Sequence, residues 1–189
     1  MAKISDSLKS GDALLIVDVQ KDFCPGGALP VEAGDTIVPV INHWIDVAVS
    51  KGVPVYATRD WHPMEHLSFK EGGGLWPTHC IQDSDGAKFH QDLGLPSSTI
   101  IVTKGVRFDQ DQNSAFDQTG LAVQFRKDGI RRVWVAGLAE DVCVLATVLD
   151  GRREGFDVVL LAHATRPITS EGSEKARQQM QDAGARIVA

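Results

Sequence analysis

The stretch RRVWVAGLAEDVCVLATVL, residues 131–149, contains the pattern that decides the fold. Its first part is a short apolar run that predicts a buried strand over Arg131–Gly137. The sequence then changes to a nearly unbroken apolar segment, which predicts a buried helix beginning near Asp141. A second apolar run follows and predicts a strand over Asp157–Ala162. A strand, a helix and a strand in this order are typical of a parallel β-α-β unit.

The rest of the chain continues this alternation. Apolar residues at helical spacing predict a helix that ends near Gly52 and a polar-faced helix over about Ser170–Ala183. Strands that are continuously apolar indicate a parallel sheet covered by helices on both faces. We therefore predict a single α/β domain over residues 1–189, a three-layer α/β/α fold with a mainly parallel, Rossmann-like six-stranded sheet. The four remaining strands are expected at Ala13–Val19, Val53–Thr58, Thr99–Lys104 and Arg186–Val188.

Composition argues against several classes of function. The chain has 19 Lys and Arg against 25 Asp and Glu, a formal charge of −6, and no basic run. Such a chain is not expected to bind nucleic acid or an anionic membrane. Its three cysteines are widely spaced, which argues against a disulfide framework and a zinc knuckle. The polar opening MAKISDSLKSGD and the lack of a membrane-length apolar run predict a cytoplasmic protein without a signal peptide.

Reactive side chains follow the predicted strands at one edge of the sheet. Ligands of open α/β sheets bind outside the carboxyl ends of the strands, where this chain has Asp18, Asp60, Lys104 and Cys143. A structural interpretation makes Cys143 a small core residue and Asp18 with Lys104 a buried ion pair. A chemical interpretation makes Cys143 a nucleophile at a helix start, with Asp18 as its base and free N–H groups as an oxyanion hole. Either way, we expect these charges to titrate as a coupled set.

The long segment Asp60–Ser98 lacks clear periodicity and is the second functional candidate. Loops of this length in compact domains are usually functional or disordered, and its Trp, Pro and His clusters favour the first. Asp60 and His62 are two residues apart, which places them on one face of an extended chain, and His79 would return across the loop. Such a set is typical of a catalytic metal site, but surface histidines would give the same pattern. His66 is either a fourth ligand or a residue that supports the ligands.

Five segments, taken together and in order, carry a family resemblance. They resemble the nicotinamidases of the isochorismatase-like cysteine hydrolase family from about Ala13 to Val188. The combination of Asp-x-His with Trp-Pro-x-His resembles the metal-bearing nicotinamidase branch in particular. The segments are IVDVQKDFCPGGAL, TRDWHPMEHLSF, LWPTHC, KGVRFDQDQNSAF and GLAEDVCV.

The resemblance implies an activity. A metal-dependent amidohydrolase of this kind converts nicotinamide to nicotinate and ammonia through a cysteine thioester. Its cofactor is one divalent transition metal, zinc in the first place, with iron or manganese as alternatives. The implied partner is a small-molecule amide, and the oligomeric state stays open, a homo-oligomer included. The alternative within the same family is an amidase that acts on a carbamoyl or ureido compound, and such enzymes usually lack the metal set.

The resemblance also implies roles for individual positions. The implied catalytic triad is Asp18, Lys104 and Cys143. The implied metal ligands are Asp60, His62 and His79. The implied oxyanion hole consists of the backbone N–H groups of Ala139 and Cys143, beside a cis peptide bond between Leu138 and Ala139. The implied pyridine pocket is lined by Phe23, Leu29 and Trp76.

Four positions depart from the family pattern. Glu140 and Val142 stand where many members have threonine and an aromatic residue. Asn113 and His163 stand where many members have tyrosine and aspartate. The triad and the metal set are intact, so these departures bear on substrate preference and not on the hydrolase chemistry.

Overall fold

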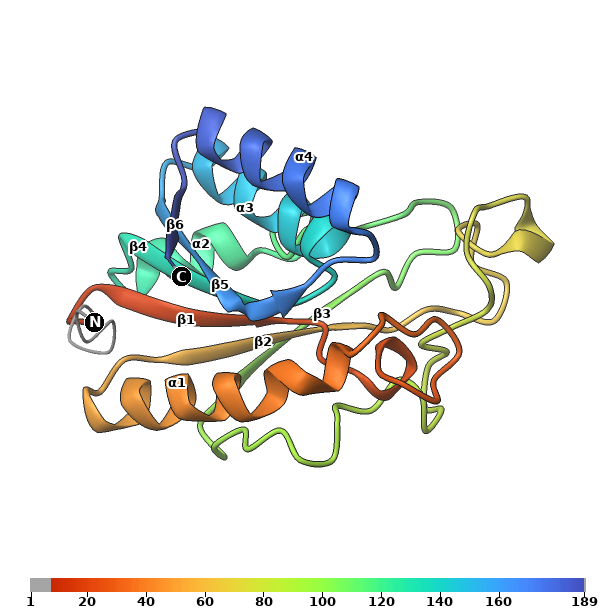
Figure 1. Ribbon diagram of the computed structural model, residues 1–189, viewed down its shortest axis with the longest axis horizontal. Helices are drawn as coiled ribbons and strands as arrows, with labels where there is room; N and C mark the ends of the chain where they lie inside the picture. The colour runs from red at the N-terminus through yellow and green to blue at the C-terminus, as the bar shows by residue number, and fades with distance from the viewer. Residues whose placement is uncertain (1–7, 189) are drawn as a thin grey trace.

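The computed structural model describes residues 8–188 and contains a six-stranded sheet in which every neighbouring pair is parallel. The strand order is β3-β2-β1-β4-β5-β6, and helices cover both faces (Figure 1). The predicted α/β fold is therefore confirmed, while the single domain over residues 1–189 stays a prediction whose limits include positions outside the described residues. The strands are β1 (Asp12–Val17), β2 (Val55–Asp60), β3 (Ile100–Lys104), β4 (Arg132–Leu138), β5 (Asp157–Arg166) and β6 (Arg186–Val188).

The four α-helices found within residues 8–188 divide between the two faces of the sheet. Helix α1 (Val38–Ser50) lies on one face, and α2 (Leu121–Lys127), α3 (Leu145–Arg153) and α4 (Ser170–Asp182) lie on the other (Figure 1). Successive side chains of β1 point to opposite faces, so Leu14 and Ile16 pack into the core beneath α1 while Leu15 and Val17 pack into the second core. Burial on both faces explains why this strand is apolar at every position after Asp12.

Apart from shifts of one or two residues at the ends of other elements, three elements differ from the sequence expectation. Helix α2 was not expected, because seven residues are too few to show a clear helical period. Strand β5 continues to Arg166, so His163 lies inside the strand, with an exposed side chain, and not after it. The helix expected near Asp141 begins with a π-helical turn, η5 (Glu140–Val144), before α3.

The backbones of β1 and β4 approach closely where the site lies. Gly137 has a φ of 122°, and a Cβ atom there would lie 2.0 Å from the carbonyl oxygen of Val17. Only glycine fits this position, because any side chain would overlap the neighbouring strand. The close approach brings the residue after β1 next to the turn after β4.

The long loop between β2 and β3 extends from the carboxyl end of the sheet (Figure 1). It contains a short 3-10 turn, Lys70–Gly72, and two isolated bridges, one joining His62 to Ile81 and one joining Phe69 to Trp76. The bridges fold the loop back on itself, so its histidines return to the end of β2.

Among residues 8–188, no helix combines the length and the apolar character needed to cross a membrane. Cys24, Cys80 and Cys143 are free and buried. Part of the opening segment, on which the expectation about a signal peptide rests, lies outside the described residues.

Candidate active site

Asp18 directly follows β1 and is completely buried. Its φ is 48°, in the left-handed region that aspartate tolerates better than most residues. Its backbone N–H donates to the hydroxyl of Thr58 at 3.1 Å, and the same hydroxyl donates to Asp18 Oδ1 at 2.6 Å. The neighbouring strand β2 therefore fixes both the backbone and the carboxylate of this residue.

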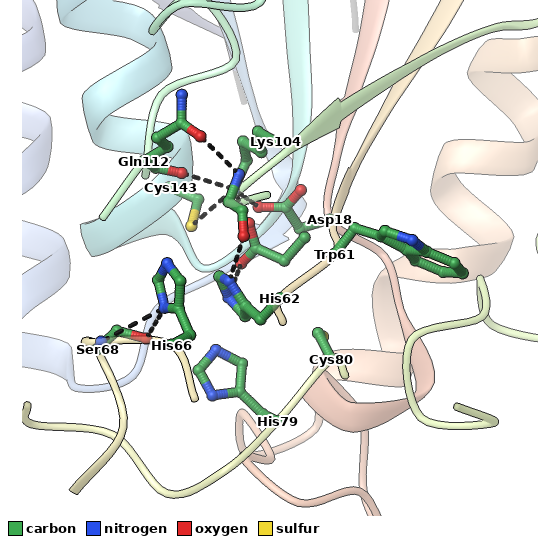
Figure 2. A network of polar contacts seen from close by, with 12 residues as sticks. Asp18, Trp61, His62, His66, Ser68, His79, Cys80, Lys104, Gln112 and Cys143 are labelled. Atoms are coloured by element: carbon green, nitrogen blue, oxygen red, sulfur yellow. Dashed lines mark hydrogen bonds and ion pairs between the residues drawn. The ribbon is translucent and has the colours of Figure 1, made fainter. Parts of the chain in front are cut away.

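Lys104 ends β3 and lies at the centre of the buried charges, with 1% of its surface exposed. Its Nζ is 2.7 Å from Asp18 Oδ2 and 3.7 Å from Cys143 Sγ (Figure 2). The same Nζ is 2.5 Å from Asp60 Oδ1. Carboxylate oxygens of Asp18 and Asp60 lie within 4.8 Å of each other and of the sulfur. The ion pair of the structural interpretation is thus present, and it converges on the thiol as the chemical interpretation requires.

Burial and the neighbouring charges together favour the protonated thiol of Cys143. Burial raises the pKa of the thiol well above its usual value, and the attraction of Lys104 is opposed by Asp18 and Asp60. Burial also raises the pKa of Asp18, against the opposing effect of Lys104. Asp18, Lys104 and Cys143 thus shift one another's pKa, which agrees with the expectation that they titrate together. The raised pKa of Cys143 does not fit a simple cysteine with a low pKa. A reaction at this sulfur therefore needs a nearby base, and Asp18, with a carboxylate oxygen within 4.8 Å of the sulfur, is the candidate.

Asp60, His62 and His79 meet the requirements of a metal site, because their ligand atoms all lie within 4.8 Å of one another. His62 Nδ1 is bonded to the carbonyl oxygen of Gly105 at 2.9 Å, and His79 Nδ1 to that of Pro77 at 2.7 Å. A carbonyl only accepts, so each Nδ1 carries the proton and each Nε2 keeps a lone pair for a metal.

The neighbours of Asp60, the third member of the set, keep its carboxylate charged and therefore able to bind a metal. One oxygen accepts from Lys104, while Oδ2 lies 3.6 Å from His62 Nε2. Burial would raise the pKa of Asp60, but Lys104 and His62 outweigh it and hold this pKa well below the usual range. Burial lowers the pKa of His79, which favours the neutral imidazole that binds a metal. One carboxylate and two imidazoles with open positions fit a divalent transition metal.

Gly105 allows the metal set to form. Its φ is 66°, and a Cβ atom at this position would lie 2.5 Å from Cε1 of His62. The carbonyl that orients His62 can come this close only because residue 105 has no side chain.

His66 lies beside the set but is not among the three residues whose ligand atoms converge. Its Nδ1 is bonded to Ser68 Oγ at 2.7 Å and its Nε2 to the carbonyl oxygen of Gln110 at 3.1 Å, so both nitrogens are engaged. Its ring stacks on that of His62, with centroids 4.1 Å apart (Figure 2). Of the two alternatives left by the sequence, the structure therefore favours the supporting position.

One cavity joins the thiol to the metal set. Its wall contains Asp60, His62, His79, Ala139 and Cys143, together with Phe23, Leu29 and Trp76, all positions implied by the resemblance. Sequence reasoning missed several further wall residues, because they lie in loops without a pattern of their own. These are Pro30, Val31, Ser68, Asp111 and Ile168.

The turn after β4 presents Ala139 and Cys143 to this cavity. The peptide bond between Leu138 and Ala139 is cis, as the resemblance implied. The carbonyl oxygen of Ala139 accepts from the N–H groups of Val142 and Val144, both at 3.1 Å, which makes the turn wider than an α-helical one. Cys143 lies inside this wide turn, and 6% of its surface is exposed.

A sequence model of the Isochorismatase domain matches residues 12–189. The chain belongs to the isochorismatase family. It is 36% identical to a nicotinamidase of Escherichia coli strain K12 over 93% of each chain. Its fold matches the pyrazinamidase of Pyrococcus horikoshii in complex with zinc, with a TM-score of 0.92 and 44% identity over 94% of this chain and 98% of that one. It also matches PnC1 from L. infantum in complex with nicotinate, with a TM-score of 0.88 and 39% identity over 95% and 94%.

Within this isochorismatase-family chain, the four departures fall in different places. Val142 and Asn113 line the cavity, and Asn113 Oδ1 accepts from Cys143 Sγ at 3.8 Å. Glu140 is buried behind the turn, and His163 is exposed on β5. Only the first two are placed to contact a substrate.

Proposed function

We propose that the chain hydrolyses nicotinamide to nicotinate and ammonia through a thioester on Cys143. The observation that carries the proposal is a single cavity whose wall holds a buried thiol beside Asp18 and Lys104 and, within the same space, the Asp60, His62 and His79 set. The likeness to a nicotinamidase, to a pyrazinamidase with zinc and to a protein with bound nicotinate supports it.

The reaction follows from the positions of the chain's own groups. Asp18 takes the thiol proton, and the sulfur attacks the carboxamide carbon while the oxygen gains negative charge. The backbone N–H groups of Ala139 and Cys143 donate to that oxygen. Asp18 then returns the proton to the departing nitrogen, which leaves as ammonia. Water attacks the thioester carbon with its proton passing to Asp18, and nicotinate leaves as the thiol re-forms.

Lys104 stabilises the negative charges that develop during this reaction. Its ammonium bridges Asp18 and Asp60 and lies within 3.7 Å of the sulfur. A positive charge at this distance stabilises a thiolate as it forms, and burial strengthens the interaction because little water screens it. The pKa of Lys104 is raised well above its usual value, since Asp18 and Asp60 outweigh the burial that would lower it.

Asp60, His62 and His79 would hold the divalent metal. A bound ion supplies a Lewis acid that a pyridine nitrogen can approach, which orients the ring. Zinc is the first candidate, since the matched pyrazinamidase contains it, with iron or manganese as alternatives. Phe23, Leu29 and Trp76 would contact the ring faces. The absence of a nucleic-acid partner, the cytoplasmic location and the oligomeric state stay predictions.

Removing the metal is expected to lower activity, and adding back a divalent transition metal is expected to restore it. The reason is that the three ligand side chains lose the ion they share, which leaves the carboxylate of Asp60 beside Lys104 and His62 alone and removes the ion that would orient the substrate ring. The measurement is ammonia release before and after chelation, with the metal content followed by elemental analysis and the melting temperature by thermal unfolding. Full activity in a sample shown to be metal-free would contradict the metal's role.

Benzamide is expected to be a poor substrate. It has the carboxamide and ring shape of nicotinamide but lacks the ring nitrogen, and apolar walls alone discriminate weakly between the two. A site with a specific polar partner rejects the analogue that lacks the matching group, so we expect kcat/KM to fall at least ~10²-fold. Pyrazinamide keeps the nitrogen and should remain a substrate. His62→Ala should reduce the nicotinamide-to-benzamide ratio by harming nicotinamide more.

A screen of ammonia release separates this proposal from its alternative. Nicotinamide, pyrazinamide, benzamide and a panel of carbamoyl and ureido compounds are compared at equal concentration with the metal-loaded protein. The proposal predicts the highest kcat/KM for the pyridine and pyrazine amides. A carbamoyl or ureido compound as the best substrate, or equal rates for benzamide and nicotinamide, would favour the alternative amidase.

A further inference from the structure

Two carboxylates precede Cys143, and no step of the proposed reaction uses them. Glu140 is completely buried and Asp141 is half-buried. In the described chain, the cavity wall takes Ala139, Val142 and Cys143 from this turn but neither carboxylate. Both side chains therefore lie behind the turn, between the site and α4.

Glu140 is held by four donors from two other elements. Its Oε1 accepts from Ser173 Oγ at 2.6 Å and from Arg177 Nε at 2.8 Å. Its Oε2 accepts from Arg177 Nη2 at 2.8 Å and from the hydroxyl of Thr165. Two parallel bonds from one guanidinium fix the direction as well as the position of a carboxylate. The turn is thereby tied to both β5 and α4.

These bonds also keep Glu140 charged. Burial would raise the pKa of this carboxyl, but hydrogen bonds from Arg177, Ser173 and Thr165 outweigh it and hold the pKa below its usual range. The ion pair is consequently formed throughout the neutral range. Glu140 also stands directly after Ala139 and three residues before Cys143, the two residues whose N–H groups are assigned to the oxyanion.

Asp141 has a different contact. Its Oδ1 accepts from the N–H of Ile168 at 2.8 Å and its Oδ2 from that of Thr169 at 3.4 Å. Gly172 allows this approach, since a Cβ atom there would lie 2.1 Å from Asp141 Oδ2. Ile168 is a wall residue of the cavity, so Asp141 is bonded to a segment that would contact the substrate. Glu140, in contrast, ties the turn itself to β5 and α4.

We propose that Glu140 is a positioning residue for the oxyanion hole, and that its network with Arg177 holds the N–H groups of Ala139 and Cys143 where the tetrahedral oxyanion forms. Asp141 positions the cavity wall through Ile168. The inference rests on the proposed function. Oxyanion donors are effective only when they are fixed in advance, and a misplacement of about 1 Å can cost roughly 10²-fold in rate.

The first test compares two variants of adjacent residues. Glu140→Gln keeps the shape but weakens the tie to Arg177, so we expect kcat for nicotinamide to fall about 10-fold or more with KM changed less than about twofold, the pattern of a contact that matters in the transition state. Asp141→Asn loosens a wall that contacts substrate and transition state alike, so it should mainly raise KM. Arg177→Lys, which keeps the charge but loses the paired donors, should resemble Glu140→Gln with a smaller effect.

The second test does not depend on turnover. Pyridine-3-carbaldehyde is the aldehyde counterpart of nicotinamide, and a thiol adds across its carbonyl: the S–C bond forms, the C=O π bond opens, and the thiol proton passes to Asp18 or to the new oxygen. The adduct is tetrahedral and places its new oxygen in the oxyanion hole, as the transition state does. Nicotinate binds without forming a tetrahedral adduct. Glu140→Gln should raise the inhibition constant of the aldehyde about as much as it lowers kcat, and should leave the Kd of nicotinate nearly unchanged.

A matched control removes the same kind of ion pair elsewhere. Asp12 is 2% exposed and accepts from Arg132 Nε at 2.9 Å and Nη2 at 2.6 Å, at the opposite end of β4. Asp12→Asn should lower the melting temperature comparably but leave kcat and the aldehyde constant as in the wild type. Equal losses in Asp12→Asn and Glu140→Gln, or an unchanged aldehyde constant in Glu140→Gln, would overturn the inference. A wild-type protein without nicotinamide turnover would instead contradict the proposed function.

Discussion

Cys143→Ala is expected to abolish nicotinamide hydrolysis, with a loss on the order of 10⁶-fold, as found when the nucleophile of a serine protease is removed. The sulfur lies in the cavity wall beside Lys104 and within 4.8 Å of a carboxylate oxygen of Asp18, so its removal takes away the nucleophile that these two groups serve. The fold should persist, because the change removes one atom from a well-packed turn. Ammonia release and thermal unfolding are measured on the same sample.

A second cysteine provides the control for this variant. Cys24 is buried in the core beneath α1, and burial raises its pKa to about 11. Cys24→Ala should therefore retain wild-type kcat apart from a modest loss of stability. Turnover by Cys143→Ala at a rate near that of the wild type would end the nucleophile hypothesis.

Asp18→Asn is expected to lower kcat roughly 10²–10⁴-fold, the range for a group that transfers a proton in the transition state. Asparagine cannot accept the thiol proton, and the raised pKa of Cys143 leaves little thiolate without a base. The substitution should be tolerated structurally, because Lys104 keeps Asp60 at 2.5 Å and is not left as an unpaired buried charge. The measurement is kcat and KM for nicotinamide, alongside the melting temperature.

Thr58→Val is a companion to this variant. It removes the hydroxyl that donates to Asp18 Oδ1 at 2.6 Å but leaves the carboxylate itself. We expect an intermediate loss of kcat, smaller than that of Asp18→Asn. A kcat for Asp18→Asn equal to the wild-type value would rule out Asp18 as the base.

Much of the fold was predictable because buried strands appear in the sequence as runs of apolar residues. The strands at 12–17 and 132–138 are covered on both faces, so their residues are nearly all apolar. The extension of β5 was missed because His163, Thr165 and Arg166 are polar and interrupt the apolar run. Helix α2 was missed because it has seven residues. The π turn at Glu140–Val144 has no sequence signature of its own.

The candidate site, like the fold, was predictable only in part. Residues at strand ends, such as Asp18 and Lys104, could be placed from the topology alone, because parallel strands end at one edge of the sheet. Whether His66 can be a metal ligand depends on the direction of its ring, which the spacing of residues in the sequence does not determine. The partner of Glu140 comes from α4, 37 residues further along the chain, so their contact could not be read from local sequence.

The central claim is that a nicotinoyl thioester forms on Cys143. The most direct measurement is mass spectrometry of the metal-loaded protein, mixed with excess nicotinamide, quenched in acid within the first turnovers and digested. The account predicts a peptide containing Cys143 that is heavier by one nicotinoyl group, absent from Cys143→Ala and enriched when hydrolysis of the thioester is slowed. Steady ammonia release with no such adduct, or with the adduct on Cys24 or Cys80 instead, would contradict it.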